Sequence, residues 1–359
     1  MSVLWYDNCM EDDMNRENFT GLVLDWYDAG HRDLPWRRTT DAYRIWISEI
    51  MLQQTRTETV KGYYARFLKA FKDVFALAKA DESEVMKLWE GLGYYSRARN
   101  LHAASKKVAF ELNGVFPDTL EGLKKLPGVG DYAAGAIASI AFGLREPALD
   151  GNQARVLSRV LGITEVIKTP QTLYDRALAI MPETDSGEYN QALMGLGAMI
   201  CLPKKPKCDM CPVRAVCVAY RDGTQSEIPR KPEKLKRKTE MRAIALVLDN
   251  EGRVYVRKRL SGMLTGLWEF PGFTDARTVS DVQACLEEMG FEVKPVCEIG
   301  KAKHIFTHLE WHMTGYVFRC VCAPADAVFE DGKGIENLAM PTALKAYRDY
   351  YTEGKTNDI

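Results

Sequence analysis

The sequence lacks a long apolar run and a leader-like N-terminus. Its longest run of small apolar residues, 133–143, is too short to span a bilayer. Residues 1–14 are acidic and show no basic stretch followed by an apolar core, so we expect neither a signal peptide nor a transit peptide. The sequence also has no internal repeat and no long low-complexity segment. These absences exclude a helical membrane protein and a solenoid, and we expect a cytoplasmic protein.

The sequence also lacks an excess of charge of either sign. Its 48 Lys and Arg residues and 49 Asp and Glu residues give a formal net charge of −1, which argues at first against a nucleic-acid partner. The distribution is uneven, however, because residues 201–242 carry 12 basic and 5 acidic side chains. Such a local positive band can hold a polyanion with salt-dependent affinity. The alternative is a solvated linker, which fits part of the band.

The length and the hydrophobic pattern indicate more than one domain. A chain of 359 residues exceeds one typical core, and apolar residues such as Phe19 and Val23 recur at helical spacing up to about residue 220. A stretch rich in Pro, Lys and Arg follows, and segments such as 243–248 then predict strands. We therefore predict a multidomain protein with an all-α region over residues 1–221, a basic linker over 222–241 and an α+β domain over 242–359.

A glycine-rich turn stands between two expected helices. Residues 118–125 predict a short helix with an Asp or Thr N-cap, and residues 133–142 predict a second, buried helix. Between them, Gly128 and Gly130 allow a tight hairpin to which a DNA backbone can come close. Free N–H groups at the start of the second helix suit a phosphate oxygen. An ordinary turn between helices is the alternative, and the two glycines alone do not decide.

Four of the nine cysteines crowd into one segment, with the spacing Cys201-x6-Cys208-x2-Cys211-x5-Cys217. Four thiolates this close in sequence can surround one compact centre, and Cys is a ligand of both iron–sulfur clusters and structural zinc. The usual four-Cys zinc pattern has two C-x2-C pairs, whereas this segment has one. Neighbouring Lys and Pro residues argue against four merely buried thiols. The spacing therefore predicts a metal centre of one of these two kinds.

The segment 48–55, Ser-Glu-Ile-Met-Leu-Gln-Gln-Thr, places a carboxylate near the end of an amphipathic helix. The neighbours of Glu49 are apolar, and partial burial would raise its pKa and keep it usable as an acid. A solvated helix residue is the alternative.

Residues 89–99 form a second segment of unusual composition, a Gly-rich turn with aromatic residues and arginines. This composition suits base stacking and phosphate contact. Core packing is the alternative for Trp89 and Tyr95.

Together these motifs resemble the endonuclease III superfamily of helix-hairpin-helix DNA glycosylases, and within it the adenine DNA glycosylases. The likeness rests on the hairpin 126–130, on Asp150-Gly-Asn152 about twenty residues later, and on the four-Cys segment. Further blocks cover nearly the whole chain: 32–37, 48–55, 89–97, 197–201, 267–271 and 306–308.

The resemblance implies a base excision repair enzyme that hydrolyses the N-glycosidic bond of adenine paired with 8-oxoguanine or with guanine. The enzyme would flip the base out of the duplex. Glu49 would then protonate adenine, while an ionised Asp150 stabilises the oxocarbenium character of the sugar. The implied sites are catalytic (Glu49, Tyr132, Asp150, Asn152), adenine-binding (Arg32, Leu34, Trp36, Gln191), DNA-binding (Gln54, Thr55, Tyr94, Gly128, Gly130) and a [4Fe–4S] cluster (Cys201, Cys208, Cys211, Cys217).

Bifunctional relatives in this superfamily carry a Schiff-base lysine just after the hairpin. This chain has Asp131 and Tyr132 there and no lysine between residues 125 and 150, so we expect a monofunctional enzyme that leaves an abasic site. Two alternatives stay open, a bifunctional pyrimidine-lesion glycosylase/lyase and a non-catalytic iron–sulfur DNA-binding module. We expect a monomer that binds double-stranded DNA at the nucleoid of a bacterial cell.

The C-terminal part resembles the Nudix hydrolase fold, through residues 267–272 and 286–291. A working Nudix box uses glutamates to hold divalent metals. Here Thr278 stands in place of the first Glu, the spacing is three residues short, and Gln283-Ala284 replace Arg-Glu. We therefore expect no pyrophosphatase activity. An unrelated α+β domain is the alternative.

The resemblance assigns the C-terminal domain a reading role instead. It implies that Phe306, Thr307 and His308 form a loop that recognises 8-oxoguanine. The family often has Ser in place of Thr307, and the extra methyl group leaves the hydroxyl donor available.

Overall fold

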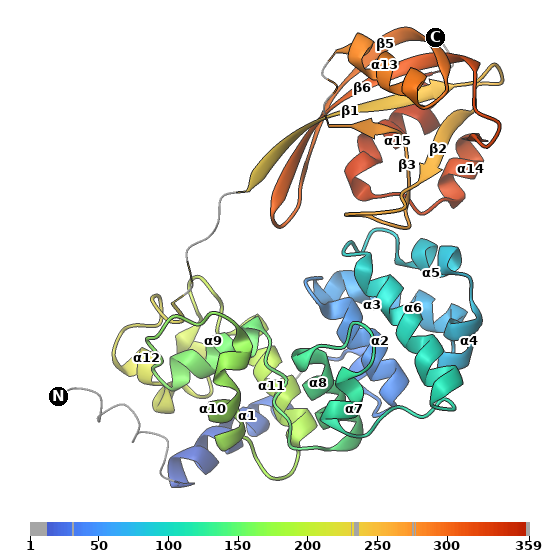
Figure 1. Cartoon of the computed structure of the whole chain (residues 1–359). Coiled ribbons are helices and arrows are strands. Elements are labelled where there is room, and N and C mark those ends of the chain that lie inside the picture. The colour runs from blue at the N-terminus through green and yellow to red at the C-terminus, as the bar shows by residue number, and fades with distance from the viewer. Residues whose placement is uncertain are drawn as a thin grey trace. The chain divides into compact units, whose positions relative to one another are not determined.

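The computed structural model describes residues 13–30, 32–230, 232, 237–274, 276 and 278–356. The contacts between residues divide the chain into two compact units, and Figure 1 labels their helices and strands. The first unit draws on Met1–Lys79 and Asn100–Glu233, and the second on Ala80–Arg99 and Lys234–Ile359. A short internal segment, 80–99, thus packs with the C-terminal residues. Among the described residues, no helix is both long enough and apolar enough to cross a membrane.

The first unit is helical. Its α-helices are α1 (Asp13–Gly30), α2 (Ala42–Leu52), α3 (Thr57–Ala70), α4 (Val74–Lys79), α7 (Leu120–Lys124), α8 (Asp131–Phe142), α9 (Gly151–Val160), α10 (Tyr174–Ala179), α11 (Ser186–Met199) and α12 (Val218–Arg221). Helix α6 (Ser96–Lys106) contributes residues to both units. Short 3-10 helices cover Pro35–Arg37, Pro170–Leu173, Cys208–Met210 and Arg214–Val216, and a π-helix covers Lys107–Glu111.

Helices α2 and α8 pack against each other and form one core of this unit. Residues 133–139 of α8 are all buried, and most are Ala or Gly, so the helix can approach its neighbours closely. A Cβ at Gly135 would collide with the carbonyl oxygen of Pro147. The small residues of α8 therefore let the helix lie directly against the segment that leads to Asp150.

A second core of the first unit lies between α1, α9, α10 and α11. Helix α9 has a buried apolar face, as the regular spacing of its apolar residues predicts. The buried apolar residues of this core include Phe19, Val23, Leu149, Val156, Leu157, Val160, Leu193 and Leu196. This core holds α9, and with it the residues at the N-terminus of α9, in a fixed position.

The second unit contains a mixed sheet and the helices around it. Its strands are β1 (Lys238–Leu248), β2 (Val254–Lys258), β3 (Trp268–Glu269), β4 (Gly272–Phe273), β5 (Glu292–Ile305), β6 (Leu309–Cys322) and β7 (Val328–Glu330). Its helices beyond α6 are α5 (Glu82–Trp89), α13 (Val279–Glu288), α14 (Gly332–Asn337) and α15 (Lys345–Thr352), and Thr342–Leu344 is a 3-10 helix. The strand order is β3-β2-β1-β6-β5, with β4 paired to β1 and β7 to β2.

Side chains alternate between the two faces of this sheet, as strand geometry requires. Ala243, Ala245 and Val247 of β1 pack on the face covered by α13. Ile244 and Leu246 pack on the opposite face with residues of α14 and α15. Both faces of β1 are therefore buried, which explains its nearly continuous run of apolar residues.

Strand β1 is longer than the pattern over 243–248 predicts. It begins at Lys238, because its polar first half pairs in parallel with β6, from Lys238 opposite Leu309 onward. Backbone hydrogen bonds to the distant strand β6 produce this extension, and the composition of residues 238–242 does not predict it. Part of the predicted linker, residues 231 and 233–236, lies outside the described residues, and the boundaries 1–221, 222–241 and 242–359 stay predictions.

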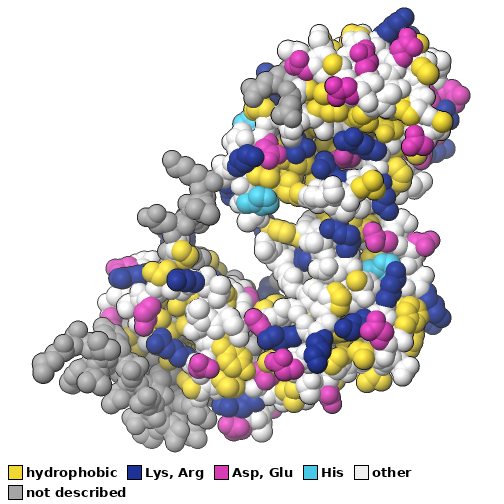
Figure 2. Space-filling view, in the orientation of Figure 1, with side chains coloured by type: hydrophobic (Ala, Val, Ile, Leu, Met, Phe, Trp, Pro, Cys, Tyr) yellow, Lys and Arg dark blue, Asp and Glu magenta, His cyan; other side chains and the backbone are white. Residues whose placement is uncertain are grey.

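Charges of both signs are interspersed on the surface. On the face drawn in Figure 2, basic and acidic side chains alternate over both units, in line with the net charge of −1. This face shows no large region of a single sign.

Candidate active site

Glu49 and Tyr132 meet in the interior of the first unit. Glu49 lies on α2 and is only 4% exposed, and Tyr132 lies in the first turn of α8. The Tyr132 hydroxyl donates a hydrogen bond of 2.5 Å to Glu49 Oε2. Burial raises the pKa of Glu49 to about 7, and the charge of Asp150 adds to this rise, while the Tyr132 hydrogen bond and Arg37 oppose it. A carboxyl group with this pKa is partly protonated near neutral pH and can act as an acid.

Asp150 is the N-cap of α9. Its Oδ1 accepts hydrogen bonds from the backbone N–H groups of Asn152 (2.8 Å) and Gln153 (2.7 Å), and its Oδ2 accepts one of 2.8 Å from the Asn152 side chain. Burial raises the pKa of Asp150, while these three donors and Arg155 oppose the rise. Three N–H donors surround this carboxylate and favour its charged form, whereas Glu49 has one hydroxyl donor.

Asn152 is itself held by a buried arginine. Arg155 donates from Nη2 to Asn152 Oδ1 (2.9 Å) and to the Gly197 carbonyl (2.8 Å), and from Nε to the Cys201 carbonyl (2.7 Å). A Cβ at Gly197 would lie 2.6 Å from the Cβ of Asn152, so α11 approaches α9 closely at this point. Asn152 therefore has a fixed position beside Asp150.

A polar group that the sequence analysis missed lies near Glu49. Arg37 donates from Nη2 to the Gln191 carbonyl (3.2 Å) and lies over the ring of Tyr27, 5.2 Å from its centroid. Tyr27 donates to Gln191 Oε1 (3.2 Å). The Nε of Arg32 and the Nη1 of Arg37 are buried donors with no acceptor among the described residues. A nucleobase with several hydrogen-bond acceptors could accept from both of these N–H groups. Arg37 stands inside the matching block 32–37, which is the only sequence signal that could have found it.

Two other residues with an implied role in adenine binding are buried apolar side chains. Leu34 is 2% exposed and Trp36 is 5% exposed. The Trp36 ring packs edge-on against Tyr64, with 5.4 Å between the ring centroids. Their positions suit apolar contact with the face of a base, and not a hydrogen bond to it.

The predicted hairpin joins α7 and α8. Thr119 caps α7, as the sequence predicts, by accepting from the backbone N–H of Gly122. Gly128 has a φ of +77°, which L side chains rarely adopt, and a Cβ there would lie 2.6 Å from Asn100. At Gly130 nothing lies within 4 Å of a Cβ position, and no side chain caps α8. The N-terminus of α8 therefore stays open to a phosphate.

Gln54 and Thr55 follow the end of α2. Gln54 is exposed and has a φ of +55°, a backbone conformation that is uncommon for a residue with a side chain. Thr55 donates from its hydroxyl to the Gln53 carbonyl (3.3 Å). The turn thus presents an exposed amide side chain next to the helix that carries Glu49.

The four cysteines of the 201–217 segment line one cavity. They are free thiols, each half-buried, and Arg159 and Pro206 line the same cavity. Arg159 donates from Nη1 to Cys201 Sγ at 3.3 Å. Among the described residues, no three His, Cys, Asp or Glu side chains are grouped as ligands of one metal ion. Four thiols around a shared cavity fit a multi-atom cluster.

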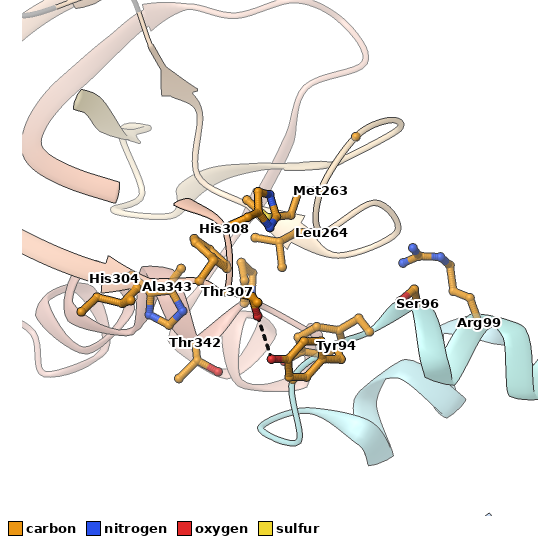
Figure 3. A pocket seen from close by; sticks show the side chains of 16 residues that line it. Tyr94, Ser96, Arg99, Met263, Leu264, His304, Thr307, His308, Thr342 and Ala343 are labelled. Atoms are coloured by element: carbon orange, nitrogen blue, oxygen red, sulfur yellow. Dashed lines mark hydrogen bonds between the residues drawn. The ribbon is translucent and has the colours of Figure 1, made fainter. Parts of the chain in front are cut away.

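The second unit brings Tyr94 and the 306–308 segment together. Phe306, Thr307 and His308 form the turn between β5 and β6, and Thr307 and His308 are exposed. The Tyr94 hydroxyl and Thr307 Oγ1 are hydrogen-bonded at 2.9 Å (Figure 3). Both residues line a cavity of about 390 Å³ that Arg99, Leu264 and His304 also line.

Residues 89–97 alternate between buried and exposed positions, and most of their large side chains are internal, in contrast to the surface that their composition suggests. Trp89, Tyr95 and Arg97 are buried, whereas Tyr94 is 46% exposed. Core packing, the alternative for Trp89 and Tyr95, is therefore confirmed. Tyr94 and the residues of the 306–308 turn belong to the second unit, and the catalytic and adenine-binding candidates belong to the first.

Two different protein families match the two parts of the chain. Residues 47–182 match the family described as HhH-GPD superfamily base excision DNA repair protein, and residues 243–349 match the NUDIX domain. A solved structure titled as a thermostable thymine-DNA glycosylase is 30% identical, with a TM-score of 0.54, and covers 58% of this chain and 98% of its own. These matches confirm a helix-hairpin-helix glycosylase region followed by a Nudix-like domain.

Curated relatives extend the match to most of the chain. An adenine DNA glycosylase of Mus musculus is 34% identical over 91% of this chain and 76% of its own length. An adenine DNA glycosylase of Buchnera aphidicola subsp. Baizongia pistaciae is 35% identical over 81% of this chain and 83% of its own. The chain therefore belongs to the adenine DNA glycosylases, base excision repair enzymes that act on adenine.

Proposed function

We propose that this enzyme removes adenine paired with 8-oxoguanine, and adenine paired with guanine less efficiently, by hydrolysis without strand cleavage. One observation carries the proposal: two carboxyl groups in the first unit, one buried and one half-buried, have different hydrogen-bond partners. Glu49 has one hydroxyl donor and a pKa raised to about 7, whereas Asp150 accepts three N–H bonds. Carboxyl groups in unlike surroundings can take an acid role and a charge-stabilising role in one reaction.

In the proposed reaction, protonated Glu49 donates its proton to N7 of the flipped adenine. The bond between N9 and C1′ then breaks, its electron pair goes to the base, and adenine leaves as a neutral molecule. Asp150 stabilises the positive charge that develops on the sugar. A water molecule adds to C1′, and the Glu49 carboxylate takes up its proton, so that the acid is restored and an abasic site remains.

The adenine pocket would use the polar group beside Glu49. Arg32 and Arg37 have buried N–H donors for which the described part of the chain supplies no acceptor, and the ring nitrogens of adenine are acceptors. A base that accepts from these donors would relieve the cost of leaving them unpaired. Leu34, Trp36 and Gln191 complete the proposed pocket, with the two apolar side chains as its wall. Tyr132 and Asn152 would hold Glu49 and Asp150 in place.

The proposed enzyme is monofunctional because it has no lysine nucleophile after the hairpin. The first residues of α8 are Asp131 and Tyr132, and no lysine occurs between Lys125 and Asp150. Lys124 precedes the hairpin and pairs with Asp131 at 2.8 Å. A strand-cleaving lyase needs an amine that forms a Schiff base with the sugar, and water takes this place in the proposed reaction.

We propose that Cys201, Cys208, Cys211 and Cys217 hold a [4Fe–4S] cluster. Their four free thiols line one cavity, and thiolates are the ligands that hold such clusters. The cluster would supply structure to the basic loop around it, and the proposed hydrolysis has no step that uses it. Phosphates of the DNA would meet this loop and the open N-terminus of α8 at Gly130.

The proposed lesion reader is the turn of the second unit. Phe306, Thr307 and His308 lie at the tip of the β5–β6 hairpin, and Thr307 contacts Tyr94. Gln54 and Tyr94 would enter the duplex where bases are displaced. The Nudix-like domain would read the damaged base without hydrolysing nucleotides, since Thr278 is the N-cap of α13 and not a metal-binding glutamate.

A single-turnover assay on four duplexes tests the proposal. The duplexes carry 8-oxoG:A, G:A, 8-oxoG:C or a thymine glycol, and each reaction is analysed with and without alkali. We expect fast adenine release from 8-oxoG:A, slower release from G:A, and strand breaks only after alkali. Glu49→Gln and Asp150→Asn should each lose most of this activity while lesion-DNA binding persists, because the folds of their helices do not depend on the lost proton or charge.

Each alternative gives a different result in this assay. Strand breaks without alkali, or cleavage at the thymine glycol, would indicate a bifunctional pyrimidine-lesion enzyme. Binding without any base release would indicate a DNA-binding module. If Glu49→Gln or Asp150→Asn released adenine at the wild-type rate, the role proposed for the substituted residue would be wrong.

A further inference from the structure

The segment 80–99 is attached to the C-terminal residues by charged side chains. Lys87 on α5 donates from Nζ to the backbone carbonyls of Leu338 (3.1 Å) and Glu336. Arg99 donates from Nη1 to the Thr265 carbonyl. These cations satisfy carbonyl groups at the C-terminal end of α14 and in the loop that contains Thr265, so the attachment is directional and does not depend on apolar contact alone.

Glu90 is the centre of this attachment. Its Oε1 accepts from Arg348 Nη1 of α15 (2.8 Å) and from the backbone N–H of Met340 (3.3 Å), and its Oε2 accepts from Lys87 Nζ (2.6 Å). The Glu90 side chain is 19% exposed and that of Arg348 is 27% exposed, so water screens the pair only partly. We name this set of Lys87, Glu90 and Arg348 the latch.

The latch lies at the base of the loop that carries Tyr94. Glu90 is the C-cap of α5, and Gly91, Gly93 and Tyr94 follow with φ values of +94°, +72° and +48°. Trp89 Nε1 and Arg97 Nη2 both donate to the Gly93 carbonyl (3.2 Å each), so the loop is held together internally. The position of Tyr94 against the β5–β6 turn therefore depends on how the base of the loop is anchored. The Tyr94 hydroxyl itself contacts Thr307 at 2.9 Å, at the edge of the cavity in Figure 3.

We propose that Glu90 and Arg348 are positioning residues for lesion recognition: their ion pair holds the Tyr94 loop against the β5–β6 turn, so that Tyr94 and Thr307 face the damaged base together. The proposal rests on the proposed function, since it concerns how that enzyme distinguishes 8-oxoG:A from G:A. Neither residue touches DNA or adenine in this scheme. The latch affects selectivity through Tyr94 and Thr307, and it leaves the Glu49 chemistry unchanged.

Full-length variants in a double-mutant cycle test this inference. Glu90→Ala removes the centre of the latch, Arg348→Met keeps the side-chain volume and removes only the charge, and Glu84→Ala is the matched control on the exposed side of α5. The measurement is the ratio of single-turnover rates on 8-oxoG:A and G:A. We expect the ratio to fall about tenfold in Glu90→Ala and Arg348→Met, with the G:A rate unchanged and the control equal to wild type.

Combining each change with Thr307→Ala separates positioning from a loss of stability. If the latch acts through the contact between Tyr94 and Thr307, Glu90→Ala should cause no further fall in the ratio once Thr307 is Ala. A merely destabilising change would instead lower both rates, or add to the effect of Thr307→Ala. Should Glu90→Ala fail to fold, Arg348→Met carries the same test.

The outcomes distinguish this inference from the function on which it rests. A wild-type enzyme without preference for 8-oxoG:A would overturn the proposed lesion specificity, and the latch proposal with it. A wild-type preference that Glu90→Ala and Arg348→Met both retain would overturn the latch proposal alone. Additive effects of Glu90→Ala and Thr307→Ala would also overturn it, because the two residues would then act independently.

Discussion

At the scale of single residues, the environment of each carboxyl group decides its chemistry. Glu49 and Asp150 have similar side chains, but Glu49 is buried and Asp150 is half-buried. Glu49 receives one hydrogen bond, from Tyr132, and burial raises its pKa to about 7. Asp150 receives three N–H bonds at a helix N-terminus, where the helix dipole also favours negative charge. Burial also raises the pKa of Asp150, but these donors oppose the rise, so we propose Glu49 as the acid and Asp150 as the group that stays ionised.

Tyr132→Phe should move the pH dependence of adenine release. A general acid must be protonated, so the wild-type single-turnover rate should fall as the pH rises through about 7. The Tyr132 hydroxyl stabilises the ionised form of Glu49, and its removal should raise the pKa of Glu49 further. The falling limb of the pH–rate profile should therefore shift to higher pH. A limb that stays in place, or moves to lower pH, would contradict the assignment of this pKa to Glu49.

Glu49→Gln should stabilise the protein at alkaline pH. The pKa of Glu49 rises from 4.5 to about 7 on folding, so its protonated form is favoured in the native state. The contribution of Glu49 to the free energy of unfolding is therefore fully present below pH ~4.5. The wild type loses about 3 kcal/mol of this free energy as the pH rises through 7. Gln cannot ionise and can still accept from Tyr132.

Urea unfolding of wild type and Glu49→Gln at pH 5 and pH 8 measures this effect. The gain in unfolding free energy should be larger at pH 8, and other titrating groups cancel in the comparison. An equal difference at both pH values would mean that Glu49 does not titrate in this range.

At the scale of elements, close helix packing positions the proposed catalytic groups. Helix α2 supplies Glu49, α8 supplies Tyr132, and α9 is capped by Asp150. Small residues allow these approaches, most clearly at Gly135 of α8 and at Gly197 of α11. A side chain at either position would separate elements that carry the site.

Gly197→Ala should reduce both stability and activity. The added Cβ would lie 2.6 Å from the Cβ of Asn152 and 3.1 Å from its Cα, so α9 must shift. Overpacking of this kind costs ~1–3 kcal/mol. Asn152 holds Asp150 through a 2.8 Å bond, and its displacement should lower the single-turnover rate.

Gly21→Ala in α1 is the matched control for this change. Nothing lies within 4 Å of its Cβ position, and Ala in a helix is favoured by ~1 kcal/mol over Gly. Thermal unfolding should therefore show opposite shifts for the two variants. A Gly197→Ala protein with normal stability and rate would show that α11 and α9 can separate without consequence.

At the scale of the whole molecule, the catalytic candidates and the proposed lesion reader belong to different compact units. The first unit contains Glu49, Asp150 and the four cysteines, and the second contains Tyr94 and Thr307. We therefore expect that changes in the second unit can alter selectivity while the proposed reaction in the first unit is preserved.

Cys208→Ser should remove the proposed cluster and weaken DNA binding. The loop 201–217 has few regular elements, and metal ligation would supply much of its order. Iron and sulfide analysis should show loss of both, and the dissociation constant for lesion DNA should rise, with most of the lost affinity dependent on salt. Cys322→Ser, at an exposed thiol of β6, is the control. Unchanged DNA binding in a cluster-free protein would contradict this role of the loop.

Much of the helical region and of the site was accessible from the sequence. Local signals predicted the hairpin, including the Thr119 cap, and the strands β1, β2 and β6. The cysteine spacing predicted a metal centre, and the apolar surroundings of Glu49 predicted its raised pKa. The cap, the strands and the cysteine spacing depend on residues close in the chain, whereas the size of the Glu49 shift also depends on Tyr132 and Asp150, which are distant in sequence.

Tertiary structure decided what depends on contacts between distant residues. No local pattern shows that the Tyr132 hydroxyl contacts Glu49, that Arg37 lies beside Gln191, or that Tyr94 contacts Thr307. The segment 80–99 likewise packs with residues that follow it by more than 150 positions. The sequence alone determined the kinds of elements and the reactive groups, because propensities and caps act over a few residues. Which groups meet, and how burial changes their charge, depends on the packing of the complete fold.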